Sequence, residues 1–77
     1  MPTKNNQVDI YIEQDMEVNQ RASLVNKLEY EKGIISAWFE DGNHHRITIQ
    51  YDPNHFSHTT LIDTLKEHGY RGQVATD

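Results

Sequence analysis

The residues of this 77-residue chain that could do chemistry are its five histidines, because the chain contains no cysteine. Imidazole is a common ligand for Zn(II), Ni(II) and Cu(II), so histidines can build a metal site where thiolates are absent. The candidate ligands are His44, His45 and His68. A metal site requires the fold to bring these three side chains together.

Each histidine also has a purely structural interpretation. His44 and His45 are adjacent, and neighbouring residues of a strand point to opposite faces, so they bind one ion only if the turn is irregular. His68 stands near the end of a predicted helix, where the helix dipole favours it. His55 and His58 have the spacing of a ligand pair but straddle a helix start, so we interpret them as solvated loop residues.

The chain lacks the usual sequence signatures of an active site. Without cysteine there is no thiol nucleophile and no thiol redox chemistry. No serine, acid and histidine set has the spacing of a catalytic triad, and no glycine-rich phosphate loop occurs. We therefore predict that the protein is not an enzyme.

Length and composition predict one small domain over residues 1–77. Residues 1–6 are polar, lack the apolar segment of a secretory signal and are expected to form a flexible tail. No apolar run approaches the length of a membrane span, so we predict a cytoplasmic protein without a membrane partner. The net charge of -5 would repel a phosphate backbone, which argues against nucleic acid as a partner.

Three strands are indicated by apolar residues that alternate with polar ones. They are predicted over residues 8–13, 35–40 and 47–51. The second of them is expected to bury Ile35, Ala37 and Phe39. The turn residues 41–43 join the second and third strands as a hairpin.

Two helices are indicated by apolar residues spaced three and four apart. The first is predicted over residues 19–32, with the apolar positions Ala22, Leu24, Val25 and Leu28 and a stop at Gly33. The second follows the N-cap residue Ser57 and ends at Gly69. A short last strand is predicted over 73–75.

The order β-α-β-β-α-β predicts a ferredoxin-like α+β fold, in which an antiparallel sheet of strand order 4-1-3-2 carries both helices on one face. In this topology His44, His45 and His68 lie at the same end of the sheet as the loop after the first strand. His55 and His58 lie at the other end. The fold thus permits a Zn(II), Ni(II) or Cu(II) site near that loop.

Residues after the first predicted helix have the order and spacing of a known family. They are Gly33-Ile34, Ala37, Phe39, Tyr51-Asp52-Pro53, Phe56, Ser57, Leu61, Leu65 and Gly69-Tyr70. With them the chain resembles the heavy-metal-associated domain of soluble copper chaperones and of the amino-terminal modules of metal-pumping ATPases. The resemblance implies the same ferredoxin-like fold and a surface that docks protein partners.

The chain departs from this family at the loop that binds the metal. The family places Gly-Met-x-Cys-x-x-Cys between the first strand and the first helix to hold a soft metal such as Cu(I). Alignment without gaps puts Glu17 and Gln20 at the cysteine positions, whereas alignment on Met16 puts Val18 and Arg21 there. Cu(I) needs soft sulfur donors, so the carrier activity does not transfer. The residues of this degenerate metal loop are Asp15, Met16, Glu17, Gln20 and Arg21.

The face of the sheet opposite the helices is predicted to carry aromatic side chains. Alternation places Tyr11 and Trp38 there, with Arg46 nearby. Trp, Tyr and Arg are enriched among interface anchors, so these three residues are candidate partner contacts, although single exposed aromatics are also ordinary in small sheets. Base stacking, as in RNA-recognition domains, is opposed by the nearby acids Asp9, Glu13 and Glu40.

Two functions follow from these residues. The first is a non-enzymatic domain that acts through contacts with a protein partner or a second copy. The second is a histidine-based protein that binds or senses Zn, Ni or Cu, and no other cofactor is predicted. Acylphosphatases share the topology and need an arginine in a phosphate-cradling loop, but Asp15 and Glu17 beside Arg21 oppose an anionic substrate.

Overall fold

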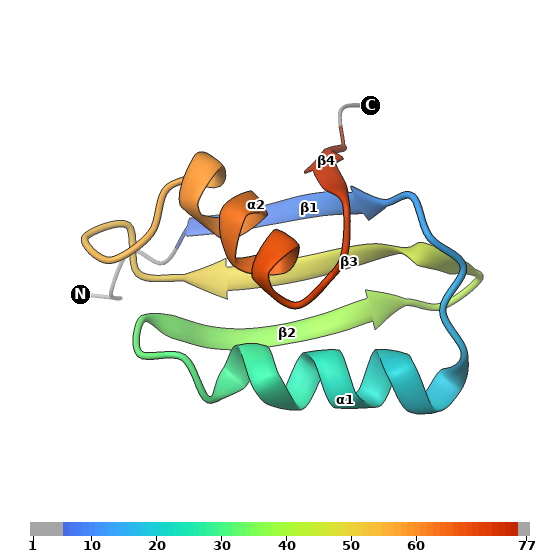
Figure 1. The fold of residues 1–77 in the computed structure, drawn as a ribbon. Helices are drawn as coiled ribbons and strands as arrows, with labels where there is room; N and C mark the ends of the chain where they lie inside the picture. Colours follow the sequence, from blue (N-terminus) through green and yellow to red (C-terminus); the bar gives the residue numbers. More distant parts are fainter. Residues whose placement is uncertain (1–5, 76–77) are drawn as a thin grey trace.

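The computed structural model describes residues 6–75, which form four strands and two helices (Figure 1). Along the chain these are β1 (Asn6–Ile12), α1 (Val18–Glu29), β2 (Ile34–Glu40), β3 (Asn43–Tyr51), α2 (His58–Glu67) and β4 (Gly72–Val74). Residues 1–5 of the predicted tail lie outside the described residues. The tail prediction is wrong for Asn6, because this residue pairs with Tyr51 at the start of β1.

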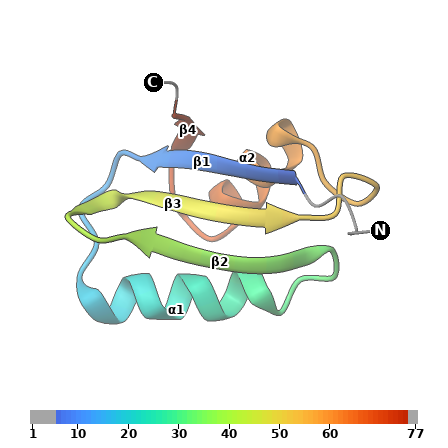
Figure 2. The same ribbon diagram turned by 180° about the vertical axis from the view of Figure 1, so that it is seen from behind.

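The strands form one antiparallel sheet in the order β2-β3-β1-β4, which confirms the predicted order 4-1-3-2. α2 lies across one face of the sheet, and α1 runs alongside the edge strand β2 (Figure 1). Both helices contribute to the same hydrophobic core, with Leu24 and Leu28 from α1 and Leu61 and Leu65 from α2. Seen from behind, no other element of the described chain covers the opposite face (Figure 2). The ferredoxin-like α+β fold is therefore confirmed, with β2 at one edge of the sheet and α1 packed beside it.

α1 ends at Glu29, earlier than the predicted end at residue 32, and a turn leads from it to Gly33. Gly33 has a φ of 101°, a conformation that glycine adopts far more readily than other residues. A Cβ atom at this position would lie 2.6 Å from the Cβ of His55. Gly33 is thus required both by the backbone conformation and by the close approach of the loop before α2.

β2 departs from the predicted alternation at its first residues. Ile34 is buried and Ile35 is exposed, whereas the sequence pattern placed Ile35 inside. A register shift between Ile34 and Ser36 in the pairing with β3 explains the difference, because a bulge adds one residue and reverses the faces before it. Beyond the bulge Ala37 faces the core as predicted, and Phe39 packs against it while partly exposed.

The ends of the later elements agree closely with the sequence pattern. Ser57 caps α2 as predicted: the N–H of Thr60 donates to its Oγ at 3.3 Å, and the N–H of Ser57 donates to Thr60 Oγ1 at 2.7 Å. β4 spans Gly72–Val74 and so begins before the predicted residue 73. Its start packs tightly, because a Cβ atom at Gly72 would lie 2.8 Å from Ile10 Cγ2.

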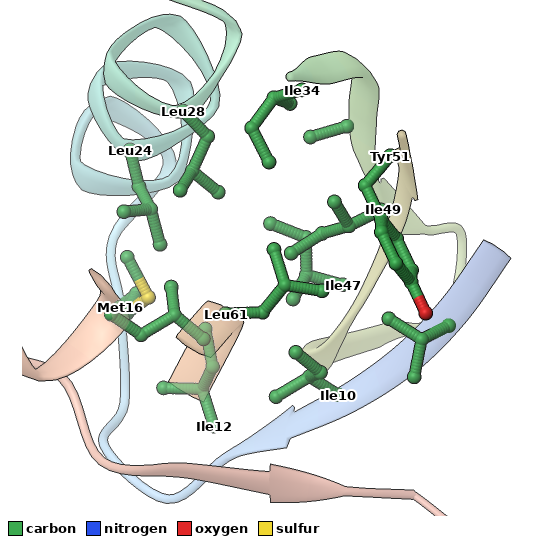
Figure 3. Close-up of a cluster of buried hydrophobic side chains, with 13 residues drawn as sticks. Ile10, Ile12, Met16, Leu24, Leu28, Ile34, Ile47, Ile49, Tyr51 and Leu61 are labelled. Carbon is green, nitrogen blue, oxygen red and sulfur yellow. The ribbon is translucent and has the colours of Figure 1, made fainter. Parts of the chain in front are cut away.

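The core lies between the helices and the inner face of the sheet (Figure 3). Its fully buried large side chains are Ile10, Ile12, Leu24, Leu28, Ile47, Ile49, Leu61 and Leu65. Met16, from the loop between β1 and α1, points into the same cluster and is 7% exposed. The loop that carries the metal in the resembling family is therefore anchored here by a core side chain. Within residues 6–75 neither helix is long and apolar enough to cross a membrane.

Candidate functional site

The loop between β1 and α1 is tied to the segment before β4 through Gln14. The side-chain Nε2 of Gln14 donates to the carbonyl oxygen of Gly69 at 2.9 Å. Its Oε1 accepts from the N–H of Arg71 at 2.8 Å, and the N–H of Glu13 donates to the carbonyl of Arg71 at 2.9 Å. Both ends of the Gln14 amide are thus used in joining two loops.

Glu17 and Gln20 act as a helix cap. Glu17 is the N-cap residue of α1, and its N–H donates to Gln20 Oε1 at 2.8 Å. In the alternative alignment the cysteine positions are Val18, which is 66% exposed, and Arg21, whose Nη1 donates to the carbonyl of Met16 at 2.6 Å. Neither pair offers a sulfur atom, so the residues present do not fit Cu(I).

His45 is the one predicted ligand that contacts the degenerate metal loop. Its Nδ1 lies 2.7 Å from the carbonyl oxygen of Ile12, and its Nε2 lies 3.0 Å from Oδ1 of Asp15. The Tyr11 ring stacks on the imidazole with a centroid separation of 5.3 Å. These contacts fix the ring between the end of β1 and the carboxylate of Asp15, whose side chain is 99% exposed.

The predicted trio of histidines does not assemble. His44 is exposed, and His68 lies half-buried at the end of α2 with an Nε2 atom that has no hydrogen-bond partner in the structure. Among residues 6–75 no group of three or more His, Cys, Asp or Glu side chains is placed to hold a metal ion. His45 and Asp15 form a pair of possible metal ligands, and no third His, Cys, Asp or Glu side chain of residues 6–75 joins them.

His55 and His58 lie near the other end of β3, as predicted. His55 Nε2 is 3.9 Å from Asp52 Oδ2, and the His58 ring meets Tyr51 edge-on at a centroid distance of 6.1 Å. Tyr51 is the last residue of β3, whereas His45 is near its first. His55 and His58 therefore lie at the opposite end of β3 from His45 and Asp15.

The open face of the sheet is largely occupied by a polar network centred on Asp9. Thr48 Oγ1 donates to Asp9 Oδ1 at 2.7 Å, and Arg46 donates to Asp9 Oδ2 through Nη2 at 2.8 Å and Nε at 3.2 Å. The Thr48 hydrogen bond and the Arg46 guanidinium hold the pKa of Asp9 below its usual value, although partial burial opposes this. Arg46 also lies 3.8 Å from Glu40, so it is engaged within the molecule.

Trp38 lies on the edge strand β2 and lines a groove between that strand and α1. The groove has a volume of 330 Å³. Its apolar lining is formed by Val18, Ala22, Val25, Ala37, Trp38 and Phe39, and the polar residues Arg21 and Asn26 of α1 complete it. Ala22 is one of the apolar positions whose spacing predicted the helix, and the structure buries Leu24 and Leu28 of this set but leaves Ala22 at the surface. α1 thus presents small apolar residues to the groove.

Two acidic features border this groove. At the hairpin end a second hollow is lined by Trp38 and Phe39 together with Glu40 and Asp41, so the apolar and acidic surfaces share two residues. Towards the other end of α1, the N–H of Ala37 donates to Glu29 Oε2 at 3.3 Å. The sequence pattern pointed to Trp38 but not to Val18, Glu29 or Asp41, because their proximity depends on how α1 packs at the sheet edge.

Comparisons with known proteins identify the fold. No protein-family model and no curated protein sequence matches the chain. The N-terminal domain of a potential copper-translocating P-type ATPase from Bacillus subtilis, solved in its Cu(I)-loaded state, matches with a TM-score of 0.78 and 17% identity. That match covers 92% of this chain and 88% of the other.

Two further solved structures give the same result. Oxidized MerP from Ralstonia metallidurans CH34 matches with a TM-score of 0.80 and 11% identity over 95% of this chain and 100% of its own. The yeast copper transporter domain Ccc2a matches with a TM-score of 0.76 and 12% identity, and the match covers 96% of this chain and 99% of that domain. At these identities the likeness shows the fold alone. The chain thus has the ferredoxin-like fold that its resemblance to heavy-metal-associated domains predicted.

Proposed function

We propose that this chain is a non-enzymatic protein-binding domain that keeps the fold of metal carriers but does not carry Cu(I) in the loop between β1 and α1. The observation that supports this most directly is the apolar groove beside Trp38. Val18 is 66% exposed and Trp38 is 40% exposed, and both line the same groove. Exposed apolar side chains that gather in a hollow are typical of interaction sites.

The loop itself supports the same proposal. Gln14 and Gln20 use their amides in hydrogen bonds that hold the loop and begin the helix, and Met16 is part of the core. A carrier loop must release and accept a metal, which requires donor atoms that are available to it. In this chain the corresponding groups stabilise the fold, so we place the function on the surface beside the loop.

We propose a partner surface that overlaps only in part with the one that the sequence indicated. Tyr11 stacks on His45 and Arg46 bonds to Asp9, so both residues have structural roles within the molecule. Trp38 remains a candidate contact, now together with Val18 and Ala22 of α1. We propose a cytoplasmic protein partner for this surface, because a chain without cysteine suits a reducing compartment.

Cross-linking in the source cells, followed by direct binding of the purified partner, tests this proposal. A photo-reactive group placed at Ser23, on the exposed side of α1, should join the chain to one partner, and Val18→Ser and Ala22→Gln should abolish that product. Tyr30→Ser is the matched control, since Tyr30 is 96% exposed and does not line the groove. Equal cross-linking by all variants would show that the groove is not the contact surface.

The second candidate function is binding of a divalent metal by His45. When one ring nitrogen of a histidine donates its N–H to a backbone carbonyl, the other ring nitrogen can bind a metal. This arrangement is common among metal-binding histidines. Here Ile12 supplies the carbonyl and Asp15 places a carboxylate 3.0 Å from the other nitrogen. Calorimetric titration with Zn(II), Ni(II) and Cu(II) should show saturable one-to-one binding that His45→Ala removes and His58→Ala leaves unchanged. Equal losses in the two variants would indicate adventitious binding.

A further inference from the structure

We propose that the groove between α1 and β2 takes a segment of a partner protein in which an apolar side chain stands next to lysine or arginine. This inference rests on the proposed protein-binding function and specifies the chemistry of the partner. It is drawn from the continuity of two surfaces, since Trp38 and Phe39 line both the apolar groove and the acidic hollow. A peptide segment that fills the apolar groove therefore also reaches the acidic hollow.

The apolar half of the site is an open hollow that offers contacts to an anchoring side chain. Val18, Ala22 and Val25 line it on α1, and Trp38 and Phe39 line it on β2. Arg21 and Asn26 also line the hollow, and Arg21 Nη1 donates to the carbonyl of Met16. The cation of the partner segment is therefore placed at the acidic hairpin and not beside Arg21. Interfaces depend on a few apolar or aromatic anchors that fill such hollows, while surrounding contacts exclude water. An aliphatic side chain in this position would cover apolar surface that is now exposed to solvent.

The acidic half of the site selects a cation. Glu40 and Asp41 are both exposed at the hairpin that ends β2 and line a hollow together with Trp38. Arg46 lies 3.8 Å from Glu40, so Asp41 is the carboxylate on which the proposal mainly depends. A lysine or arginine there meets carboxylates and the electron-rich face of an indole, two features that attract cations. The net charge of the chain is -5, so the field of the whole molecule acts in the same direction.

The same charges disfavour a second copy of this chain as the occupant. Two copies joined at this edge would bring two chains of net charge -5 together. Pairing of β2 with another strand would also have to displace Glu29 from the N–H of Ala37 on the free edge of the sheet. Side chains that cover an edge strand in this way oppose strand addition. A basic partner segment that lies in the groove is not repelled by the net negative charge and does not have to displace Glu29.

Trp38 provides a direct test, because it is the only tryptophan in the chain. Its fluorescence is titrated with three blocked peptides: one leucine between two lysines, the same leucine between two glutamates, and a serine between two lysines. We expect saturable binding of the lysine-leucine peptide only, weakened by added salt. Amide NMR should confine the shifts to residues 18–26 and 37–41.

Variants separate the two halves of the site. Glu40→Gln with Asp41→Asn should weaken binding of the lysine-leucine peptide by about fivefold, and Val18→Ser should weaken it to a similar extent. Tyr30→Ser should bind like the parent. All of these changes are at exposed positions, and circular dichroism verifies that each variant is folded.

The following outcomes would overturn the inference. If the glutamate peptide binds equally well, or if neutralising Glu40 and Asp41 has no effect, the partner is not selected by charge. The proposed function would still stand in that case if Val18→Ser abolished the cross-linked product. A dimer in sedimentation that Val18→Ser dissolves would identify a second copy as the occupant. Peptide binding unaffected by Val18→Ser, combined with unchanged cross-linking, would overturn both proposals.

Discussion

The N–H of Glu17 donates to Oε1 of Gln20 at 2.8 Å, so these two residues begin α1. They stand at the cysteine positions of the resembling family when the sequences are aligned without gaps. Both are exposed and lie in the first turn of the helix, where a side chain can be changed without opening the core. Both residues thus stabilise the start of the helix.

The double variant Glu17→Cys, Gln20→Cys should gain tight, one-to-one binding of Cu(I), because two thiolates would replace oxygen donors at the helix start. Loss of the cap should lower the free energy of unfolding by about 1 kcal/mol. Anaerobic competition with a chromophoric Cu(I) ligand measures the gain.

The pair Val18→Cys, Arg21→Cys is the control for this substitution. It should bind Cu(I) more weakly, because it also removes the hydrogen bond from Arg21 to the Met16 carbonyl that shapes the loop. Tighter binding by this second pair would mean that alignment on Met16 is the correct one.

Gly33→Ala should destabilise the fold by at least about 2 kcal/mol, since it combines an unfavourable positive φ with a steric clash. The new Cβ would lie 2.6 Å from His55 Cβ and 3.0 Å from Phe56 Cε2. Urea unfolding measures the change. Gly42→Ala is matched for backbone conformation, with a φ of 81° but no atom within 4 Å, and should cost only about 1 kcal/mol. Equal losses of stability in Gly33→Ala and Gly42→Ala would show that close packing of Gly33 against His55 and Phe56 does not contribute to stability.

His68→Leu should raise the free energy of unfolding by about 1 kcal/mol. The His68 Nε2 atom is buried without a hydrogen-bond partner in the structure, and an unsatisfied polar atom carries a desolvation cost that leucine avoids. Thermal and urea unfolding measure the effect. His44→Leu, at an exposed position, should change stability by less than about 0.5 kcal/mol. A clear loss of stability in His68→Leu would contradict this assignment.

Asp9→Asn should reduce the dependence of stability on pH in the acid range. Because hydrogen bonds from Thr48 and Arg46 lower the pKa of folded Asp9 below 3.8, its contribution is present above that value and is lost as pH falls through the folded pKa. The free energies of unfolding in urea at about pH 7 and about pH 3 should therefore differ less in Asp9→Asn than in the parent. Asp63→Asn, on the exposed side of α2, should leave the difference intact.

Much of the fold could be predicted because it depends on local patterns. Val8, Ile10 and Ile12 alternate along β1 and are all buried, and Ser57 caps α2 as its neighbours suggest. Such signals come from residues a few positions apart, where period and capping act directly on the backbone. The bulge that exchanges Ile34 and Ile35 was not visible, because two adjacent isoleucines satisfy either register and the pairing with β3 decides between them.

The candidate site was predicted less completely, and the reason is distance along the chain. The sequence by itself determined the order of the elements, the absence of cysteine thiolates and the presence of a single tryptophan. Only the tertiary structure decided that His45 reaches Asp15 while His44 and His68 do not join them. It also decided that Trp38 and Val18 line the same groove, because that arrangement depends on how α1 packs at the free edge of the sheet. Packing between distant elements is set by the whole core, which no local pattern encodes.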